Sequence, residues 1–253
     1  MTETGRRARN RATRHKQLID AASAIVLEKG LDGLTMQDVA DRVDCAVGTI
    51  YTYFTSKSAL LAALQSDAIR VLADSHDRGA AMWDEGLESA EVEAEAAAIA
   101  RMIGLARLII AWPELHPREF DFLQMLIGNR EKVIAPDDAR TVIPQALMLF
   151  AEGRVLIDGA VQVGAIDHDP DRPGDDSLAR VVRWISGIEG AVLVSDAAAL
   201  VADIDPDAFD LRRITERLTS ELLTAWGASQ QHLDAAFGTV DDLEARGLLL
   251  PPP

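Results

Sequence analysis

The segment from Thr35 to Lys57 constrains the fold more than any other stretch, because it combines two short helical patterns with a tight turn. Thr35 is a typical N-cap residue, whose hydroxyl accepts a backbone N–H and so marks the start of a helix. The apolar residues after it recur at helical spacing: Met36, Val39, Ala40 and Val43. The pattern predicts a short amphipathic helix that ends before Asp44.

The turn and a second helix follow directly. Asp44 lies where two steeply crossed helices need a residue with a positive φ, for which glycine is usual. Aspartate is tolerated there because its short polar side chain can visit that region. Cys45 and Ile50 are expected to point inward from a second helix over residues 46–54 and to close a three-helix core. This order is typical of a helix-turn-helix, the unit that places a helix in the major groove of DNA.

Residues 11–64 resemble the TetR family of bacterial transcriptional regulators. The resemblance rests on these positions: Gly30, Thr35, the run Gly48-Thr49-Ile50-Tyr51-x-Tyr53-Phe54, and Ser56-Lys57-x-x-Leu60. Two positions depart from the family pattern, because Asp44 replaces the usual turn glycine and Val47 stands where a polar or basic residue is common. Val47 either contacts a thymine methyl group or acts as a spacer.

The expected fold is all-α. At 253 residues the chain exceeds the usual size of one domain. We expect an N-terminal arm and three-helix helix-turn-helix DNA-binding domain over residues 1–60, and a larger C-terminal helical domain for ligand binding and dimerisation over residues 61–253. Helices are predicted over residues 57–77, 90–112, 116–128, 137–165, 177–201 and 207–226, with a shorter piece after Gly227. Residues 78–86 are expected to form a loop or a weak helix, and Pro113 to end the helix before it.

The net charge of −16 divides unevenly along the chain. Residues 1–60 hold nine lysines and arginines against seven aspartates and glutamates, whereas residues 61–253 hold sixteen against thirty-four. This asymmetry indicates that the N-terminal end meets a polyanion and that the acidic remainder is repelled by it. The partner expected from the helix-turn-helix is a double-stranded DNA operator.

The expected DNA contacts fall into three groups. The basic arm supplies phosphate or minor-groove charge through Arg6, Arg7, Arg9, Arg11 and Arg14. Hydrogen bonds and charge hold the DNA backbone through Thr35, Gln37, Thr49, Tyr53 and Lys57. The groove floor is expected to face Ala46, Val47, Gly48 and Tyr51. Ser56 and Lys57 open a helix, and a helix N-terminus favours a phosphate.

Two late helices predict a homodimer, because they are apolar on more than one face and so need more than one partner layer. The resemblance implies pairing through two such helices in a four-helix interface, and packing wholly within one chain is the alternative. The candidate interface residues are Trp184, Ile188, Val192, Leu218 and Leu222.

A small apolar or amphipathic ligand is expected in the C-terminal domain. Its candidate contacts are Met102, Trp112, Phe122, Met125, Met148, Phe150 and Arg154. Each apolar member is individually more typical of plain core. Arg154 and Asp158 stand at i, i+4 spacing, so they form either a polar anchor in a cavity or, as we favour, a surface ion pair.

Other site chemistry finds little support. The run Asp167-x-Asp169-x-Asp171 lacks the glycine and the final glutamate of a calcium loop. The histidines show no zinc-like pairing, and the single cysteine, Cys45, is typical of a small core residue rather than a thiol switch. The sequence contains no nucleophile elbow and no phosphate loop, the motifs that would indicate an enzyme. We therefore predict no catalytic residues, no metal and no cofactor.

The sequence shows no signal-peptide pattern and no apolar run long enough for a membrane helix, so we expect a cytoplasmic protein that does not enter the membrane. The most specific hypothesis is a ligand-responsive transcriptional repressor that a small molecule releases from its operator. The alternatives are an activator, or a regulator controlled by a protein partner with no small ligand. An enzyme built on a helical bundle is a third, weaker alternative.

Overall fold

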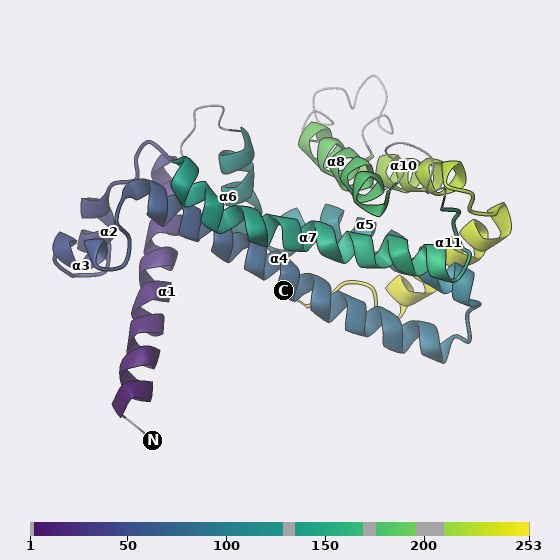
Figure 1. The fold of residues 1–253 in the computed structure, drawn as a ribbon, viewed down its shortest axis with the longest axis horizontal. Helices are drawn as coiled ribbons and strands as arrows, with labels where there is room; N and C mark the ends of the chain where they lie inside the picture. Colours follow the sequence, from purple (N-terminus) through teal and green to yellow (C-terminus); the bar gives the residue numbers. More distant parts are fainter. Residues whose placement is uncertain (1–2, 129–134, 169–175, 196–209, 253) are drawn as a thin grey trace. The chain divides into compact units, whose positions relative to one another are not determined.

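In a computed structural model the chain is all-α, as expected, and no strand occurs among the residues described, which are 3–128, 135–168, 176–195 and 210–252 (Figure 1). The helices are α1 (Glu3–Lys29), α2 (Met36–Arg42), α3 (Val47–Tyr51), α4 (Lys57–Ser89), α5 (Ala94–Leu115), α6 (Pro117–Gly128), α7 (Pro136–Gln162), α8 (Ser177–Ser195), α10 (Leu211–Ala225) and α11 (Gln230–Ala245). Among the described residues, no helix has both the length and the apolar character needed to cross a bilayer.

The helices form two compact units, one over residues 1–72 and 116–146 and the other over residues 73–115 and 147–253. The long helices α4 and α7 each supply residues to both units. The expected functional division at residue 60 stays a prediction.

The first unit is built around the buried face of α1. Its core lies under α2 and α3 and continues into the start of α4 through Leu18, Ala22, Val26, Val39, Ile50 and Leu60. Helix α6 is fastened to α1 by Arg118, whose guanidinium donates to the Ser23 hydroxyl at 3.0 Å and to the Asp20 carbonyl at 3.1 Å. The prediction of a helix over residues 116–128 is confirmed.

Residues 78–86 are helical, so of the two expected alternatives, a loop or a weak helix, the loop was wrong. The reason is tertiary packing around Trp83, which is 1% exposed and donates its indole N–H to the Leu249 carbonyl at 2.7 Å. The glycines that weakened the helical pattern permit this packing. A Cβ at Gly79 or Gly104 would stand 3.1 or 3.0 Å from the Trp83 ring, and one at Gly86 would overlap the side chain of Leu243.

The second unit has α5 at its centre, with buried residues on nearly every side of that helix. Arg107 of α5 is 4% exposed and collects three carboxylates from neighbouring helices. Its guanidinium lies 2.8 Å from Glu216 of α10 and 2.6 and 2.9 Å from Asp241 and Glu244 of α11. The cluster satisfies a buried charge and holds three helices together.

Several helix ends differ from the expected ones. Helix α5 continues to Leu115 with Pro113 inside it. A proline this close to a C-terminus disturbs only the last turn. Helix α10 begins after Asp210, whose carboxylate accepts the Arg213 backbone N–H at 2.6 Å. The expected extensions over 196–201 and 207–209 lie outside the described residues, as do Asp169 and Asp171 of the rejected calcium loop.

Candidate nucleic-acid interface

The turn between α2 and α3 has the predicted left-handed residue, because Asp44 adopts a φ of 50°. Its backbone N–H donates to the Asp41 carbonyl at 3.3 Å, and the Cys45 N–H donates to the Ala40 carbonyl at 3.0 Å. This pair of hydrogen bonds is a Schellman motif, which satisfies the last carbonyls of a helix and turns the chain sharply. It sets the direction in which α3 leaves α2.

Both helices of the motif are anchored as the sequence predicts. The Thr35 hydroxyl accepts the Asp38 backbone N–H at 3.0 Å and so caps α2. Val39, Ala40 and Ile50 are fully buried, which fixes one side of α3 against α2. Cys45 is only half-buried, so it closes the core less fully than expected.

The other side of α3 faces outward. Ala46, Gly48 and Tyr51 are exposed, while Val47 and Thr49 are half-buried. Tyr51 is 51% exposed, which is unusual for a large aromatic side chain. A Cβ at Gly48 would meet no atom within 4 Å, so the backbone there is open to a close approach. This face is free to contact the edges of bases.

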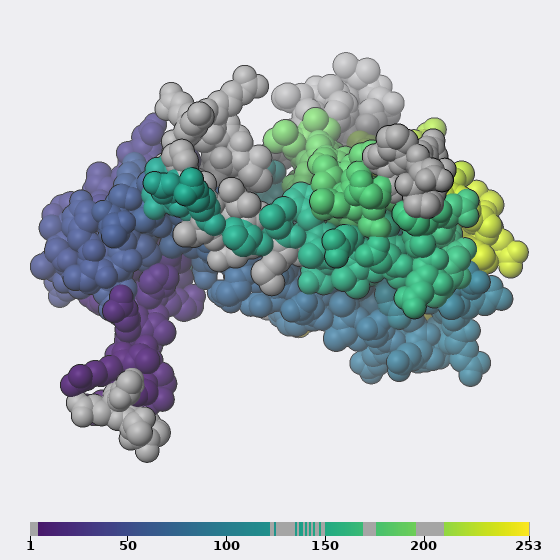
Figure 2. Space-filling model, in the orientation of Figure 1, coloured from purple at the N-terminus to yellow at the C-terminus, as the bar shows by residue number. Residues whose placement is uncertain are grey.

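The basic arm is the beginning of α1. Arg6, Arg7, Arg9 and Arg11 are all exposed on this helix, whose first turns extend away from α2 and α3 (Figure 1, Figure 2). The Arg11 guanidinium lies 5.5 Å from the centre of the Tyr53 ring, and the His15 ring lies 5.0 Å from that of Phe54. These contacts tie α1 to the exit of α3.

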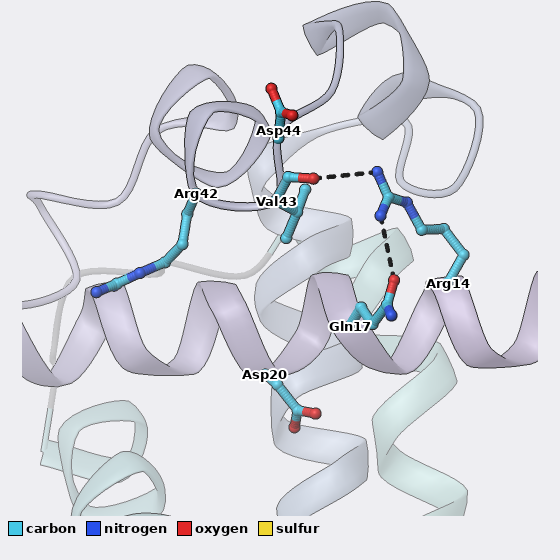
Figure 3. A pocket seen from close by; sticks show the side chains of 6 residues that line it. All are labelled: Arg14, Gln17, Asp20, Arg42, Val43 and Asp44. Atoms are coloured by element: carbon cyan, nitrogen blue, oxygen red, sulfur yellow. Dashed lines mark hydrogen bonds between the residues drawn. The ribbon is translucent and has the colours of Figure 1, made fainter.

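Arg14 lies at a hollow of about 470 Å³ beside the turn (Figure 3). The hollow is lined by Arg14, Gln17, Asp20, Arg42, Val43 and Asp44. Arg14 reaches across it, with one guanidinium nitrogen 3.3 Å from the Val43 carbonyl and another 3.1 Å from the Gln17 side-chain oxygen (Figure 3). Its mixed charge does not favour an anion inside it, so we assign Arg14 first a role in holding the turn against α1.

Surface ion pairs also surround the motif. Arg42 lies 2.5 Å from Glu28, and this hydrogen bond lowers the pKa of the Glu28 carboxyl. The hydrogen bond from Thr35 and then that from Lys29 lower the pKa of Asp38. These pairs are exposed, so each adds little to stability. They pair the carboxylates of Glu28 and Asp38 with basic side chains.

Three expected DNA-backbone contacts already have partners within the protein. The Lys57 ammonium donates to the Leu31 carbonyl at 2.8 Å, and the Gln37 amide donates to the Asp41 carboxylate at 2.7 Å. The Thr35 hydroxyl donates a hydrogen bond to the Asp38 carboxylate. Ser56 caps α4 by accepting the Ala59 N–H at 3.0 Å. Lys57 therefore also positions the connection after α1, a role that the sequence did not indicate.

The expected ligand contacts do not gather in a described cavity. Met102 and Trp112 are buried in the core, and Phe150 packs against it. Arg154 is exposed and lies 3.6 Å from Asp158, which is the surface pair that we favoured. The side chains of Phe122, Met125 and Met148 lie outside the described residues. The ligand site stays a prediction.

The expected dimer residues lie mostly inside their own chain. Trp184 and Ile188 are 0% exposed, and the Trp184 indole N–H donates to the Thr219 hydroxyl at 3.0 Å. Val192 is 5% exposed, and Leu218 and Leu222 are half-buried against the same core. The exposed apolar side chains of α8 are Leu178, Val182, Leu193 and Val194, and none of them is among the candidate interface residues. A helix that is apolar all round does not reveal which side meets its own core.

Comparison with known proteins supports the interpretation of the N-terminal motif. The profile described as bacterial regulatory proteins of the tetR family matches residues 18–64. The transcriptional repressor KstR of Mycobacterium tuberculosis is 50% identical over 48 residues, which are 19% of this chain and 22% of that protein. The regulator BetI of Burkholderia lata is 40% identical over 76 residues, 29% of this chain and 39% of that protein. The chain thus spans well under half the length of these relatives.

The likeness of the fold extends further than that of the sequence. A TetR-family regulator from Mesorhizobium loti shares 17% identity with a TM-score of 0.59, over 86% of this chain and 98% of that one. SmeT, the repressor of a multidrug efflux pump in Stenotrophomonas maltophilia, shares 16% identity with a TM-score of 0.52, over 84% and 89%. The motif around α2 and α3 agrees with this profile, so residues 18–64 match the TetR family of bacterial regulatory proteins, and the fold of the chain is similar to those of TetR-family regulators.

Proposed function

We propose that this protein is a dimeric transcriptional regulator, a repressor that binds a double-stranded DNA operator and is released by a small molecule. The observation that carries the proposal is the outward face of α3. A short helix held by a sharp turn presents Tyr51 and an open Gly48 on a surface with no protein neighbour at that glycine. A tyrosine that is 51% exposed adds little to packing within the protein, which favours a role in binding a partner.

In this proposal α3 lies in the major groove, with Ala46, Val47, Gly48 and Tyr51 toward the base edges. Thr49 and Tyr53 flank this face and contact the DNA backbone. Lys57 serves both its structural partner and a phosphate, because an ammonium has three donors and Leu31 accepts one of them. The arginines at the start of α1 add charge without sequence preference.

Two copies are needed for a two-fold operator, because the half-sites lie about one DNA turn, roughly 34 Å, or a multiple of it apart. The exposed apolar side chains of α8 supply a surface for pairing, and two copies would bury it symmetrically. A ligand in the second unit acts by favouring one of two conformations, and a different spacing of the heads then lowers operator affinity. An apolar or amphipathic ligand suits the apolar interior of that unit. Because the proposed target is a DNA operator, the protein would act in the bacterial cytoplasm.

A binding-site selection from random double-stranded DNA tests the proposal directly. We expect the full chain to enrich a palindromic site. Tyr51→Ala should change the enriched bases, because this side chain lies on the outward face of α3. Lys57→Ala should enrich the same site but bind every DNA more weakly, because a phosphate contact carries no base information. Arg217→Ala, which changes an exposed residue of α10, serves as the control.

The assignment fails if the full chain enriches no sequence. It also fails if Lys57→Ala changes the preferred bases while Tyr51→Ala does not. Circular dichroism of each variant separates a binding defect from unfolding, which matters for Lys57 because it also holds the Leu31 carbonyl.

A further inference from the structure

A cluster of three potential metal ligands lies in the second unit, where the first turns of two helices meet. Glu93 directly precedes α5, Glu95 lies in its first turn, and His232 lies in the first turn of α11. One ligand atom from each side chain lies within 4.8 Å of the others. Glu93 is exposed, and Glu95 and His232 are half-buried. The site is therefore open to solvent yet supported by packed helices.

The packing of α5 against α11 brings these residues together. Leu233, Ala236, Val240 and Leu243 of α11 are buried in the same core as α5. Farther along, Arg107 meets Glu244, and these residues are separated by 137 positions. Glu95 and His232 have the same separation in the sequence. The two helices thus run in the same direction and in register, so their N-terminal turns are level.

The three side chains have no hydrogen bond or ion pair with other described residues. Other acidic residues nearby are paired, because Asp241 and Glu244 of α11 both form ion pairs with Arg107. The backbone of His232 is held separately, since its N–H donates to the Ser229 hydroxyl at 3.1 Å. Two ligands of one zinc ion, each about 2 Å from the metal, lie at most about 4 Å apart. Separations of no more than 4.8 Å therefore place the three ligand atoms within reach of a single ion.

We propose that Glu93, Glu95 and His232 bind a divalent first-row transition metal, with Zn²⁺ as the best match. An imidazole nitrogen favours zinc over magnesium or calcium, which prefer oxygen ligands alone. Zinc takes three protein ligands and one water at distances of about 2.0–2.2 Å, so modest side-chain rotations complete the shell. Two carboxylates and a neutral imidazole balance the charge of the ion. The earlier expectation of no metal considered histidine pairs and cysteines, and here the partners are glutamates of another helix.

A metal at this position would join the N-terminal ends of α5 and α11. Farther along the same two helices, Arg107 and Glu244 already join them through an ion pair. Because the site needs both helices in place, it exists in the folded chain and not in the unfolded chain. Binding should therefore raise the thermal midpoint as the zinc concentration increases. None of its three residues belongs to the candidate nucleic-acid interface.

The test is isothermal titration of the full-length, chelator-treated chain with zinc chloride, alone and in excess magnesium. We expect one tight site per chain that magnesium does not displace. Glu95→Gln and His232→Gln should each weaken it at least tenfold and abolish the zinc-dependent rise in the thermal midpoint. Glu88→Gln and His168→Gln are matched controls at exposed positions outside the cluster, and they should stay within twofold of the original.

Three results would overturn the site. These are no tight binding by the original chain, displacement of zinc by magnesium, and unchanged affinity in both ligand variants. Magnesium displacement would identify general attraction to an acidic surface, because the chain carries a net charge of −16. Circular dichroism without metal confirms that each variant is folded, so loss of affinity reports on ligation.

Discussion

At the scale of single residues, the best predicted feature is the turn between α2 and α3. Thr35 and Asp44 could be placed from sequence because capping and positive φ are local requirements that few side chains meet. Lys57 was only partly predictable. Its position at a helix start is visible in the sequence, but the Leu31 carbonyl that it binds comes from another part of the first unit. Contacts of that kind depend on packing, which a local pattern does not contain.

Asp44 gives a prediction about stability. Asp44→Val should be less stable than Asp44→Gly by about 1–2 kcal/mol, because a β-branched residue is strained at a φ of 50° and glycine is not. Chemical denaturation followed by circular dichroism measures the difference. The same pair of substitutions at Glu85, within α4, should give the opposite order by a few tenths of a kcal/mol. The same order at both positions would contradict the role of backbone strain.

At the scale of elements, helices were predicted well where one side alone is apolar and poorly where glycine is frequent. Residues 78–86 were expected to form a loop or a weak helix, and the segment contains Gly79 and Gly86, which lower helix propensity. The structure places both glycines against large side chains, where a Cβ would be too close. Trp83 was the available signal, since a large apolar residue between two small ones suits close helix packing. Its partner, Leu249, is too distant in the sequence for a pattern to connect them.

The basic start of α1 predicts a salt-dependent contribution to DNA affinity. Replacing Arg6, Arg7, Arg9 and Arg11 with glutamine keeps the helix and removes the charge. The slope of log K against log salt should flatten by about one to three units per protomer, since each neutralised phosphate contributes about −0.9. Specific and random DNA should weaken alike. Deleting residues 1–11 should act similarly. Arg217→Gln is the control, and an unchanged slope in the quadruple variant would exclude the arm from DNA contact.

Helix α8 predicts a pH dependence through Glu189. Burial raises the pKa of this carboxyl above its usual value of 4.5, and among the described residues no basic side chain offsets the burial. The folded chain therefore keeps a proton that the unfolded chain releases. The contribution of Glu189 to stability should be greatest below the ordinary glutamate pKa and should be lost as the pH rises through the folded pKa. Glu189→Gln should remove this loss and be the more stable protein at neutral pH.

Urea denaturation at several pH values between 4 and 8 is the appropriate measurement, with about one unit between steps to resolve a single titration. Glu85→Gln, at an exposed position of α4, is the control and should follow the original chain. A constant difference between Glu189→Gln and the original chain over the whole range would show that titration of this carboxyl is not the cause.

At the scale of the whole molecule, the fold class followed from the sequence, and the surfaces did not. All-α structure is evident in repeated helical periodicity. The dimer surface was assigned to Trp184 and Ile188, which are fully buried within the chain. The candidate metal ligands were missed because Glu95 and His232 lie in separate helices that only the tertiary structure brings level. Sequence patterns identify which helices are apolar, whereas the arrangement of helices decides what each side contacts.

The dimer can now be tested with substitutions on opposite sides of one helix. Leu193→Asp, at 67% exposure, should give a folded monomer that binds an operator weakly, because each interface would hold two buried charges near its two-fold axis. Ile188→Asp, at 0% exposure, should instead unfold the second unit. Ala235→Asp on α11 is the control. Analytical ultracentrifugation with circular dichroism measures both outcomes, and a folded dimer of Leu193→Asp would remove this side of α8 from the interface.

The packing around Trp83 has a consequence for spectroscopy. All four tryptophans are buried and belong to the second unit, at positions 83, 112, 184 and 226. Both tyrosines belong to the first unit, at positions 51 and 53. Indole emission, excited selectively, therefore reports the melting of the second unit alone, while tyrosine absorbance reports the first. The unmodified chain carries a separate optical label for each of its two units.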